Sequence, residues 1–211
     1  MADILILANS TKKGGFCVAG KDIETNRWVR IVGSPKGLAL NSNQIVYNDL
    51  ANNRQIIQYE PFNKIIRLDL GDAVPLRYQP ENVLIGQKTW QEIHIAKYNI
   101  TYDTPIDLWG TGDRIKAEDI KHGLVNITQS LYLIQVTNLQ FYVNNYNVNR
   151  ACFQYGNTNY DLGATMNPKI FQDIVNGTRH HNSVLTVSLG DSFLNPHSNQ
   201  YEHYKLVAAV F

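Results

Sequence analysis

The sequence of 211 residues contains only two cysteines, Cys17 and Cys152. Neither stands in a CxxC pair or at a ligand spacing from histidine, which excludes the common zinc-ribbon and zinc-finger patterns. Both lie in apolar, strand-like segments, so we expect small buried thiols in preference to a disulfide. The adjacent His180 and His181 have no carboxylate or cysteine at ligand spacing. The sequence therefore predicts no metal site and no cofactor.

Long hydrophobic runs are also missing. The apolar run at the N-terminus covers only residues 4–8, far below the roughly 20 residues of a membrane-spanning helix. An acid, Asp3, precedes it, which is unlike a secretory signal peptide. We expect a cytoplasmic protein without membrane contact.

Charge of one sign is not in excess. Lysine and arginine number 19, aspartate and glutamate 18, and the net charge is +1, which excludes a global basic field. The distribution is less even, because residues 1–36 carry a local excess of cations. This pattern indicates a modest cationic face near the N-terminus, although an ordinary solvated surface explains it equally well.

The sequence contains no catalytic motif. Ser188 and Lys205 could form a serine–lysine nucleophile, but the surrounding Ser-Leu-Gly is not the G-x-S-x-G elbow, and a hydroxyl facing outward from a strand is ordinary. Glu81 could act as a general base, but the sequence provides no partner to activate it. Asp161 and Asp191 are further acids that nothing in the sequence brings together. We therefore expect a non-enzymatic protein.

Short strand-like runs fill most of the chain. Residues 4–8 predict a strand buried on both faces, residues 16–20 and 27–32 predict the next two, and residues 9–14 predict a polar turn. Helical spacing of Trp90, Ile93 and Lys97 predicts a short helix within residues 83–98, and Asn167-Pro168 predicts the start of another.

Many short strands with a lone helix in each half are typical of two tandem OB-like β-barrels. We expect a mostly β fold with a few short helices. The predicted division is a first barrel at residues 1–85, a helical and loop connector at residues 86–129, and a second barrel at residues 130–211.

The first candidate site lies near the N-terminus. Along residues 28–31 the side chains alternate, so Val29 and Ile31 should face the core while Trp28 and Arg30 share the other face. OB surfaces hold single strands by stacking bases on aromatic rings while cations track the phosphates. In the alternative interpretation, Trp28 packs against the second barrel and Arg30 pairs with an acid of that barrel. The candidate residues of this patch are Asn9, Ser10, Lys12, Lys13, Gly15, Trp28 and Arg30.

Two further groups are candidates for ligand contact. Gln79, Glu81 and Asn82 surround Pro80 and could read a base edge, although a turn followed by a cap explains them as well. Ser188 and Lys205 lie in the closing strands and could contact a ligand or fix a turn.

The residues also resemble a known family. Leu7-Ala8-Asn9-Ser10, the Gly-Gly-Phe-Cys-Val-Ala-Gly run at residues 14–20 and Trp28-Val29-Arg30 are similar to the start of the dual OB-containing domain family. Residues 79–82, 130–134, 187–191 and 204–210 extend the similarity in order over nearly the whole chain. Ile31 and Asp191 depart from it, since proline and glutamate are expected there. The resemblance implies two OB-like barrels that bind nucleic acid or nucleotides in bacterial conflict with phage, without a demonstrated activity.

The main hypothesis is therefore non-enzymatic binding of single-stranded DNA, RNA or a nucleotide through the N-terminal barrel. The alternative is a protein-interaction or sensor subunit of a defence complex that has no contact with nucleic acid.

Overall fold

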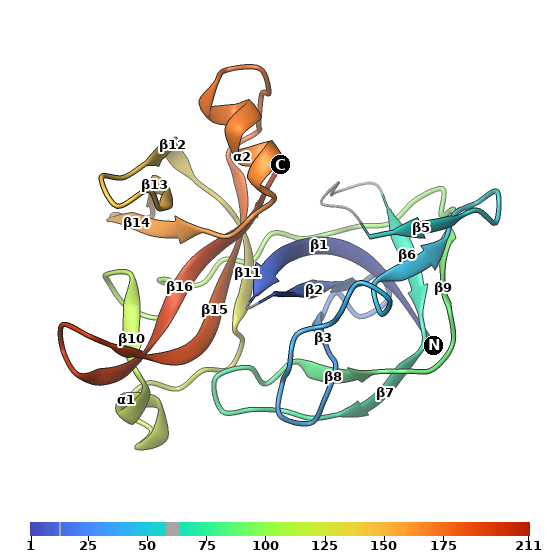
Figure 1. Ribbon diagram of the computed structural model, residues 1–211, viewed down its shortest axis with the longest axis horizontal. Helices are drawn as coiled ribbons and strands as arrows, with labels where there is room; N and C mark the ends of the chain where they lie inside the picture. The colour runs from blue at the N-terminus through green and yellow to red at the C-terminus, as the bar shows by residue number, and fades with distance from the viewer. Residues whose placement is uncertain (13, 58–63) are drawn as a thin grey trace. The chain divides into compact units, whose positions relative to one another are not determined.

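The computed structural model describes residues 1–12, 14–57 and 64–211 (Figure 1). Within them the chain is mostly strand with two helices, which confirms the predicted fold class at that level. The chain divides into two compact units: unit 1 is Met1–Leu76 with Glu81–Thr101, and unit 2 is Arg77–Pro80 with Tyr102–Phe211. The predicted division into domains at residues 1–85, 86–129 and 130–211 stays a prediction.

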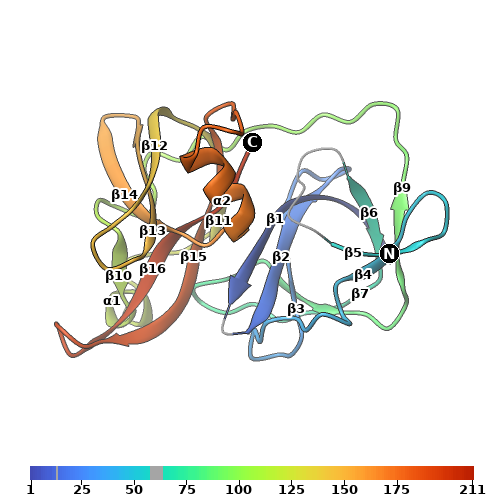
Figure 2. The ribbon, with the colours of Figure 1, turned by 45° about the horizontal axis from the view of Figure 1, so that its top comes forward.

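Unit 1 contains one large sheet. Its strands pair in the order β5-β4-β9-β6-β1-β2-β3-β8-β7. The first three strands lie side by side and curve strongly (Figure 2). The strand bounds are β1 Ala2–Lys12, β2 Gly15–Asp22, β3 Trp28–Val32, β4 Val46–Asn48, β5 Arg54–Ile56, β6 Ile65–Leu68, β7 Leu70–Ala73, β8 Asn82–Ile85 and β9 Trp90–Ile93.

The first hairpin is longer than the sequence predicts. β1 continues through Asn9 and Ser10 to Lys12, which pairs with Gly15, so the predicted turn at residues 9–14 is wrong for residues 9–12. Asn9 and Ser10 are buried, and Asn9 Nδ2 donates a hydrogen bond to the Ile57 carbonyl at 2.7 Å. Asn9 and Ser10 pair with Val18 and Cys17 of β2, so they extend the strand and do not end it.

The predicted helix within residues 83–98 is also wrong, because β8 and β9 occupy this segment. Trp90 pairs in parallel with Tyr47 of β4, and Ile93 pairs with Ile65 of β6. Trp90 and Ile93 stand at helical spacing, but their pairing with neighbouring strands determines the structure of this segment.

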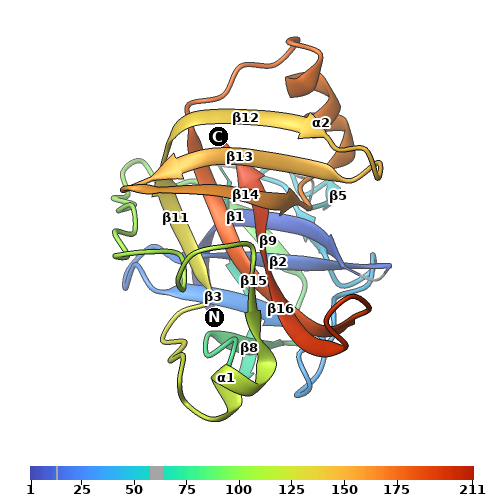
Figure 3. The same ribbon diagram turned by 90° about the vertical axis from the view of Figure 1, so that its left-hand side faces the viewer.

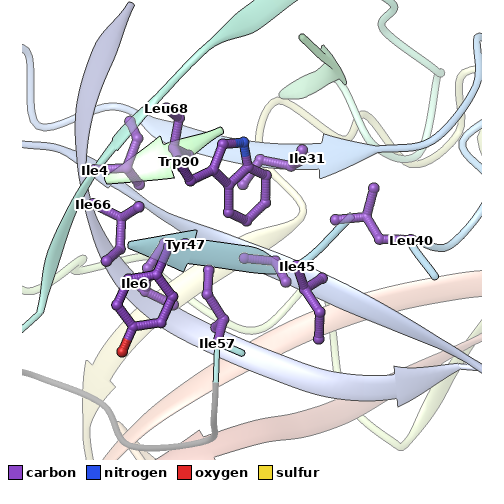
Figure 4. Packing of buried hydrophobic residues seen from close by; sticks show 11 residues of the cluster. Ile4, Ile6, Ile31, Leu40, Ile45, Tyr47, Ile57, Ile66, Leu68 and Trp90 are labelled. Atoms are coloured by element: carbon purple, nitrogen blue, oxygen red, sulfur yellow. The ribbon is translucent and has the colours of Figure 1, made fainter. Parts of the chain in front are cut away.

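The core of unit 1 explains why these strands assemble. Trp90 is almost fully buried and lies among Ile4, Ile31 and Leu68 (Figure 4). Val29 packs against the same cluster, so the predicted inward pair of Val29 and Ile31 is confirmed.

Unit 2 contains the second sheet, with the order β11-β15-β16-β14-β13-β12 and with β10 paired to β16. β12, β13 and β14 lie side by side in Figure 3. Asn167 caps α2 by accepting hydrogen bonds from the backbone of Lys169 and Ile170, which confirms the predicted helix start. The bounds are β10 Arg114–Lys116, α1 Ala117–Lys121, β11 Leu131–Gln135, β12 Thr137–Val143, β13 Asn149–Tyr155, β14 Thr158–Ala164, α2 Pro168–Val175, β15 Val184–Asn195 and β16 Gln200–Val210.

Both sheets are open in their hydrogen bonding. The pairings between described residues leave β5 and β7 at the ends of the first sheet and β11 and β12 at the ends of the second. Barrel closure is therefore not among these pairings. No helix in the described ranges is long and apolar enough to cross a membrane.

Candidate functional site

Trp28 and Arg30 share one face of β3, but neither lies at the surface. Their exposed fractions are 6 % and 2 %. Arg30 Nε lies 3.4 Å from Glu81 Oε1, and Arg30 Nη1 donates to Cys17 Sγ at 3.2 Å. Burial opposes the charge on Arg30, but Cys17 and Glu81 outweigh that effect and raise its pKa. Arg30 thus pairs with an acid, as the alternative interpretation expects, but this acid belongs to unit 1 itself and not to a second barrel.

Lys21 is a second cation that the structure removes from the expected N-terminal face. It is fully buried, and its Nζ donates to the Thr101 carbonyl at 2.7 Å. The same nitrogen lies 5.6 Å from the centre of the Trp28 ring. Lys21 and Arg30 are therefore both held inside unit 1 and contribute no charge to its surface.

The remaining N-terminal candidates lie in or beside the hairpin of β1 and β2. Ser10 is buried and faces Cys17 across the hairpin, and Gly15 lies so close to Leu40 that an added Cβ would come within 2.7 Å of its carbonyl oxygen. Lys12 ends β1, and Lys13 lies outside the described residues. A ligand role for these residues stays a prediction.

The candidates around Pro80 are buried as well. Gln79 belongs to unit 2, where its Nε2 donates to the Leu189 carbonyl at 3.1 Å. Glu81 and Asn82 belong to unit 1, in which Asn82 opens β8 and accepts a hydrogen bond from the backbone of Val74 through its carbonyl. The structure therefore does not assemble these three residues into one exposed reading edge within either unit.

Ser188 is also buried, although we expect its side chain to face outward. All residues of β15 from Val184 to Leu189 are buried, so both faces of this stretch are covered. The alternation of residues alone cannot reveal whether the second face of a strand is covered or meets solvent.

Lys205 has the most perturbed environment of the predicted site residues. Its Nζ donates to the carbonyls of Gly110 and Thr111 at 2.7 and 3.1 Å and lies 5.7 Å from the centre of the Tyr160 ring. Desolvation by burial lowers the pKa of Lys205 to about 8, against the opposing fields of Asp107 and Asp113. The amine holds a loop in which Trp109 and Gly110 have positive φ angles. This is an anchoring role.

The histidines do not gather into a metal centre. Among the described residues, no group of three or more His, Cys, Asp or Glu side chains could hold a metal ion. His203 Nδ1 instead contacts the Gly190 carbonyl at 2.9 Å. Cys17 and Cys152 are both free and partly buried.

A polar pocket that the sequence did not reveal lies in unit 1. Its volume is about 410 Å³, within the range of small-molecule sites. β4 carries Asn48, which pairs with Arg54 of β5, and the loop from β8 to β9 supplies Lys88. The pocket is lined by Asn43, Gln44, Val46, Asn48, Arg54, Ile85, Gly86, Gln87, Lys88, Thr89 and Trp90.

The walls of this pocket are held by backbone contacts. Asp69 accepts hydrogen bonds from the backbone nitrogens of Gln87 and Lys88, both at 3.0 Å, through Oδ2. Gly86 donates its N–H to the Asp69 carbonyl at 2.9 Å, and a Cβ at Gly86 would overlap with Asp69. On the opposite wall Gln44 Oε1 accepts from the backbone of Asn41. The buried Trp90 gives the pocket a rigid base in the core.

The charge of the lining is of one sign. Arg54 and Lys88 are cations, and none of the described residues of the lining carries a carboxylate. Within the described part of the chain, neither side chain takes part in a hydrogen bond or an ion pair within 4 Å. The site therefore presents two cations beside five amide or hydroxyl side chains, a set that suits an anionic, hydrogen-bonding ligand.

The sequence gives little signal for this pocket. Its residues come from two stretches, 43–54 and 85–90, that lie some 40 positions apart in the sequence. Only the parallel pairing of β4 with β9 brings the two stretches together.

Comparison with family models identifies the fold. A model described as the dual OB-containing domain matches residues 2–210. The chain belongs to the dual OB-containing domain family. No curated protein and no solved structure matches the chain. Membership confirms the resemblance seen in the sequence and gives the chain a fold that elsewhere binds oligonucleotides and oligosaccharides.

Proposed function

We propose that this dual OB protein is a non-enzymatic binder of single-stranded nucleic acid or a nucleotide, and that unit 1 makes the contact through two OB-like barrel elements of its sheet, β4–β5 and the β8–β9 loop. The observation that carries the proposal is the pocket whose described lining has Arg54 and Lys88 and no carboxylate. The proposed contact differs from the buried Trp28 and Arg30 face. The bacterial defence setting is part of the proposal and rests on the family alone.

The chemistry of the lining favours nucleic acid over a neutral sugar. Two cations complement a phosphate group, and the amides of Asn43, Asn48 and Gln87 can donate and accept hydrogen bonds at a base edge. An oligosaccharide would use the amides but would leave both cations without a charged partner.

The test is fluorescence anisotropy with labelled DNA and RNA oligomers and with free nucleotides. We expect binding that weakens as salt is raised, because phosphate contacts release counterions. Arg54→Ala and Lys88→Ala should each weaken it. Arg27→Ala and Lys36→Ala are matched controls, since these cations are exposed in unit 1 but do not line the pocket. Flat anisotropy at low salt for all ligands would remove the proposal.

A protein-interaction role is the second candidate, and one feature of unit 2 favours it. Leu194 and Tyr201 face each other across the end of the β15–β16 hairpin, with exposed fractions of 49 % and 59 %. Exposed apolar residues at a hairpin end are typical of contact with another protein. A stable complex with another protein that is lost in Leu194→Asp but kept in Arg54→Ala would favour this role.

A further inference from the structure

The lining of the unit 1 pocket carries cations, whereas carboxylates lie just outside it. Asp69 lies directly against the loop that carries Lys88, and its carboxylate is held by the backbone of Gln87 and Lys88. These hydrogen bonds lower the pKa of Asp69, so the group is ionised at neutral pH. One wall of the pocket thus carries a cation inside and a fixed anion behind it.

The other wall repeats this arrangement. Asp49 follows Asn48 at the turn between β4 and β5, and its Oδ1 accepts hydrogen bonds from the backbone of Ala51 and Asn53 at 2.9 and 2.8 Å. The hydrogen bond from the Asn53 backbone is the largest of the effects that lower the pKa of Asp49. Gln55 Nε2 also donates to Asp49, on the side of β5 away from the pocket. The two cations of the lining are therefore accompanied by two ionised carboxylates just outside it.

This pattern bears on the length of the ligand. One phosphate inside the pocket meets Arg54 and Lys88, whereas a strand that continues past the walls brings further phosphates near Asp49 and Asp69. Charges interact over about 10 Å at 0.1 M salt, so the continuing phosphates feel this repulsion. A surface that follows a strand needs cations spaced along its path, and the pocket instead concentrates its two cations in one place.

We infer that the pocket takes a single nucleotide unit with a terminal phosphate monoester, either a free nucleoside monophosphate or the phosphorylated end of a strand, and not the interior of a strand. The inference rests on the proposed function of the same pocket. Arg54 and Lys88 contact the phosphate, and the amides of Asn43, Asn48 and Gln87 contact the sugar or the base. The volume of about 410 Å³ suits one such unit.

Isothermal titration calorimetry of the full chain tests the inference with five probes. These are a nucleoside monophosphate, the same nucleoside without phosphate, inorganic phosphate, and a short oligonucleotide with and without a 5′-phosphate. We expect the nucleoside monophosphate to bind at least about tenfold more tightly than either the nucleoside or phosphate. The phosphorylated oligonucleotide should bind more tightly than its unphosphorylated form if the strand end is the natural source. Equal affinity of the two forms, with tight binding of the monophosphate, would assign the free nucleotide.

Variants separate the pocket from the rest of the protein. Arg54→Ala and Lys88→Ala should each weaken binding of the monophosphate about tenfold, whereas Arg27→Ala should leave it unchanged. Asp49→Asn keeps the acceptor that holds the turn but removes the charge, so it should improve binding of an unphosphorylated oligonucleotide.

The two proposals fail in different ways. Oligonucleotide binding that ignores the terminal phosphate and Asp49→Asn, but is lost in Arg54→Ala, would overturn the single-nucleotide inference and leave the proposed function standing. Absence of binding by every probe would overturn both.

Discussion

Lys205 offers a quantitative test of how this fold treats a buried charge. Its amine is fully buried and its pKa is lowered to about 8 from the ordinary value of 10.5. Between these two values the unfolded chain binds more protons at this site than the folded chain. Stability must therefore rise with pH in this window, because the folded protein no longer has to bury a charged amine.

The magnitude follows from the shift. A change from 10.5 to about 8 corresponds to a penalty of about 3 kcal/mol when the amine is charged in both states. Roughly 2 kcal/mol of this penalty is relieved between pH 7 and pH 9.5, since most of the folded protein is then neutral at Lys205. Keeping the assay below pH 10 avoids the titration of tyrosines.

The assay is urea denaturation at several pH values for the natural sequence and for Lys205→Met. Methionine keeps a similar shape without a titrating group, so the difference in free energy of unfolding between the two proteins isolates Lys205. That difference should shift by roughly 2 kcal/mol in favour of the natural sequence from pH 7 to pH 9.5. The surface variant Lys36→Met should show no such shift. A difference that is independent of pH would refute the reasoning.

Three further substitutions test the structural roles assigned above by chemical denaturation. Arg30→Ala removes the buried guanidinium that faces the Glu81 carboxylate and should cost about 3–5 kcal/mol, with unfolding and not selective loss of ligand as its first effect. Gly20→Ala places a Cβ against the Leu5 carbonyl and should cost roughly 3 kcal/mol or more; a neutral result would mean that the hairpin can shift. Asn167→Ala removes the cap of α2 and should cost about 1 kcal/mol.

The apolar pattern of the sequence predicts the strands of the core well. Residues 4–8 form a continuous apolar run and become the buried part of β1, and the Val29 and Ile31 alternation gives the correct face of β3. These predictions succeed because burial of apolar surface acts on the residues themselves. β14 escapes prediction although its exposed Asn159 and Asp161 alternate regularly with the buried Tyr160 and Leu162.

The polar residues mislead for a physical reason. Lys21, Arg30 and Lys205 each look like surface cations in the sequence, but partners that lie far along the chain satisfy them inside the protein. The pocket of unit 1 is hidden for the opposite reason, since Arg54 and Lys88 meet only after β4 and β9 have paired. A single sequence does not reveal pairings of such long range.

The central claim is that the pocket of unit 1 holds a nucleotide. The most direct test is a ¹H–¹⁵N NMR titration of the full chain with a nucleoside monophosphate, with backbone amides assigned. The account predicts saturable shifts centred on Asn43, Asn48, Arg54 and Lys88, which Arg54→Ala weakens. Shifts centred on Trp28 or on unit 2, or no shifts at millimolar nucleotide, would contradict it.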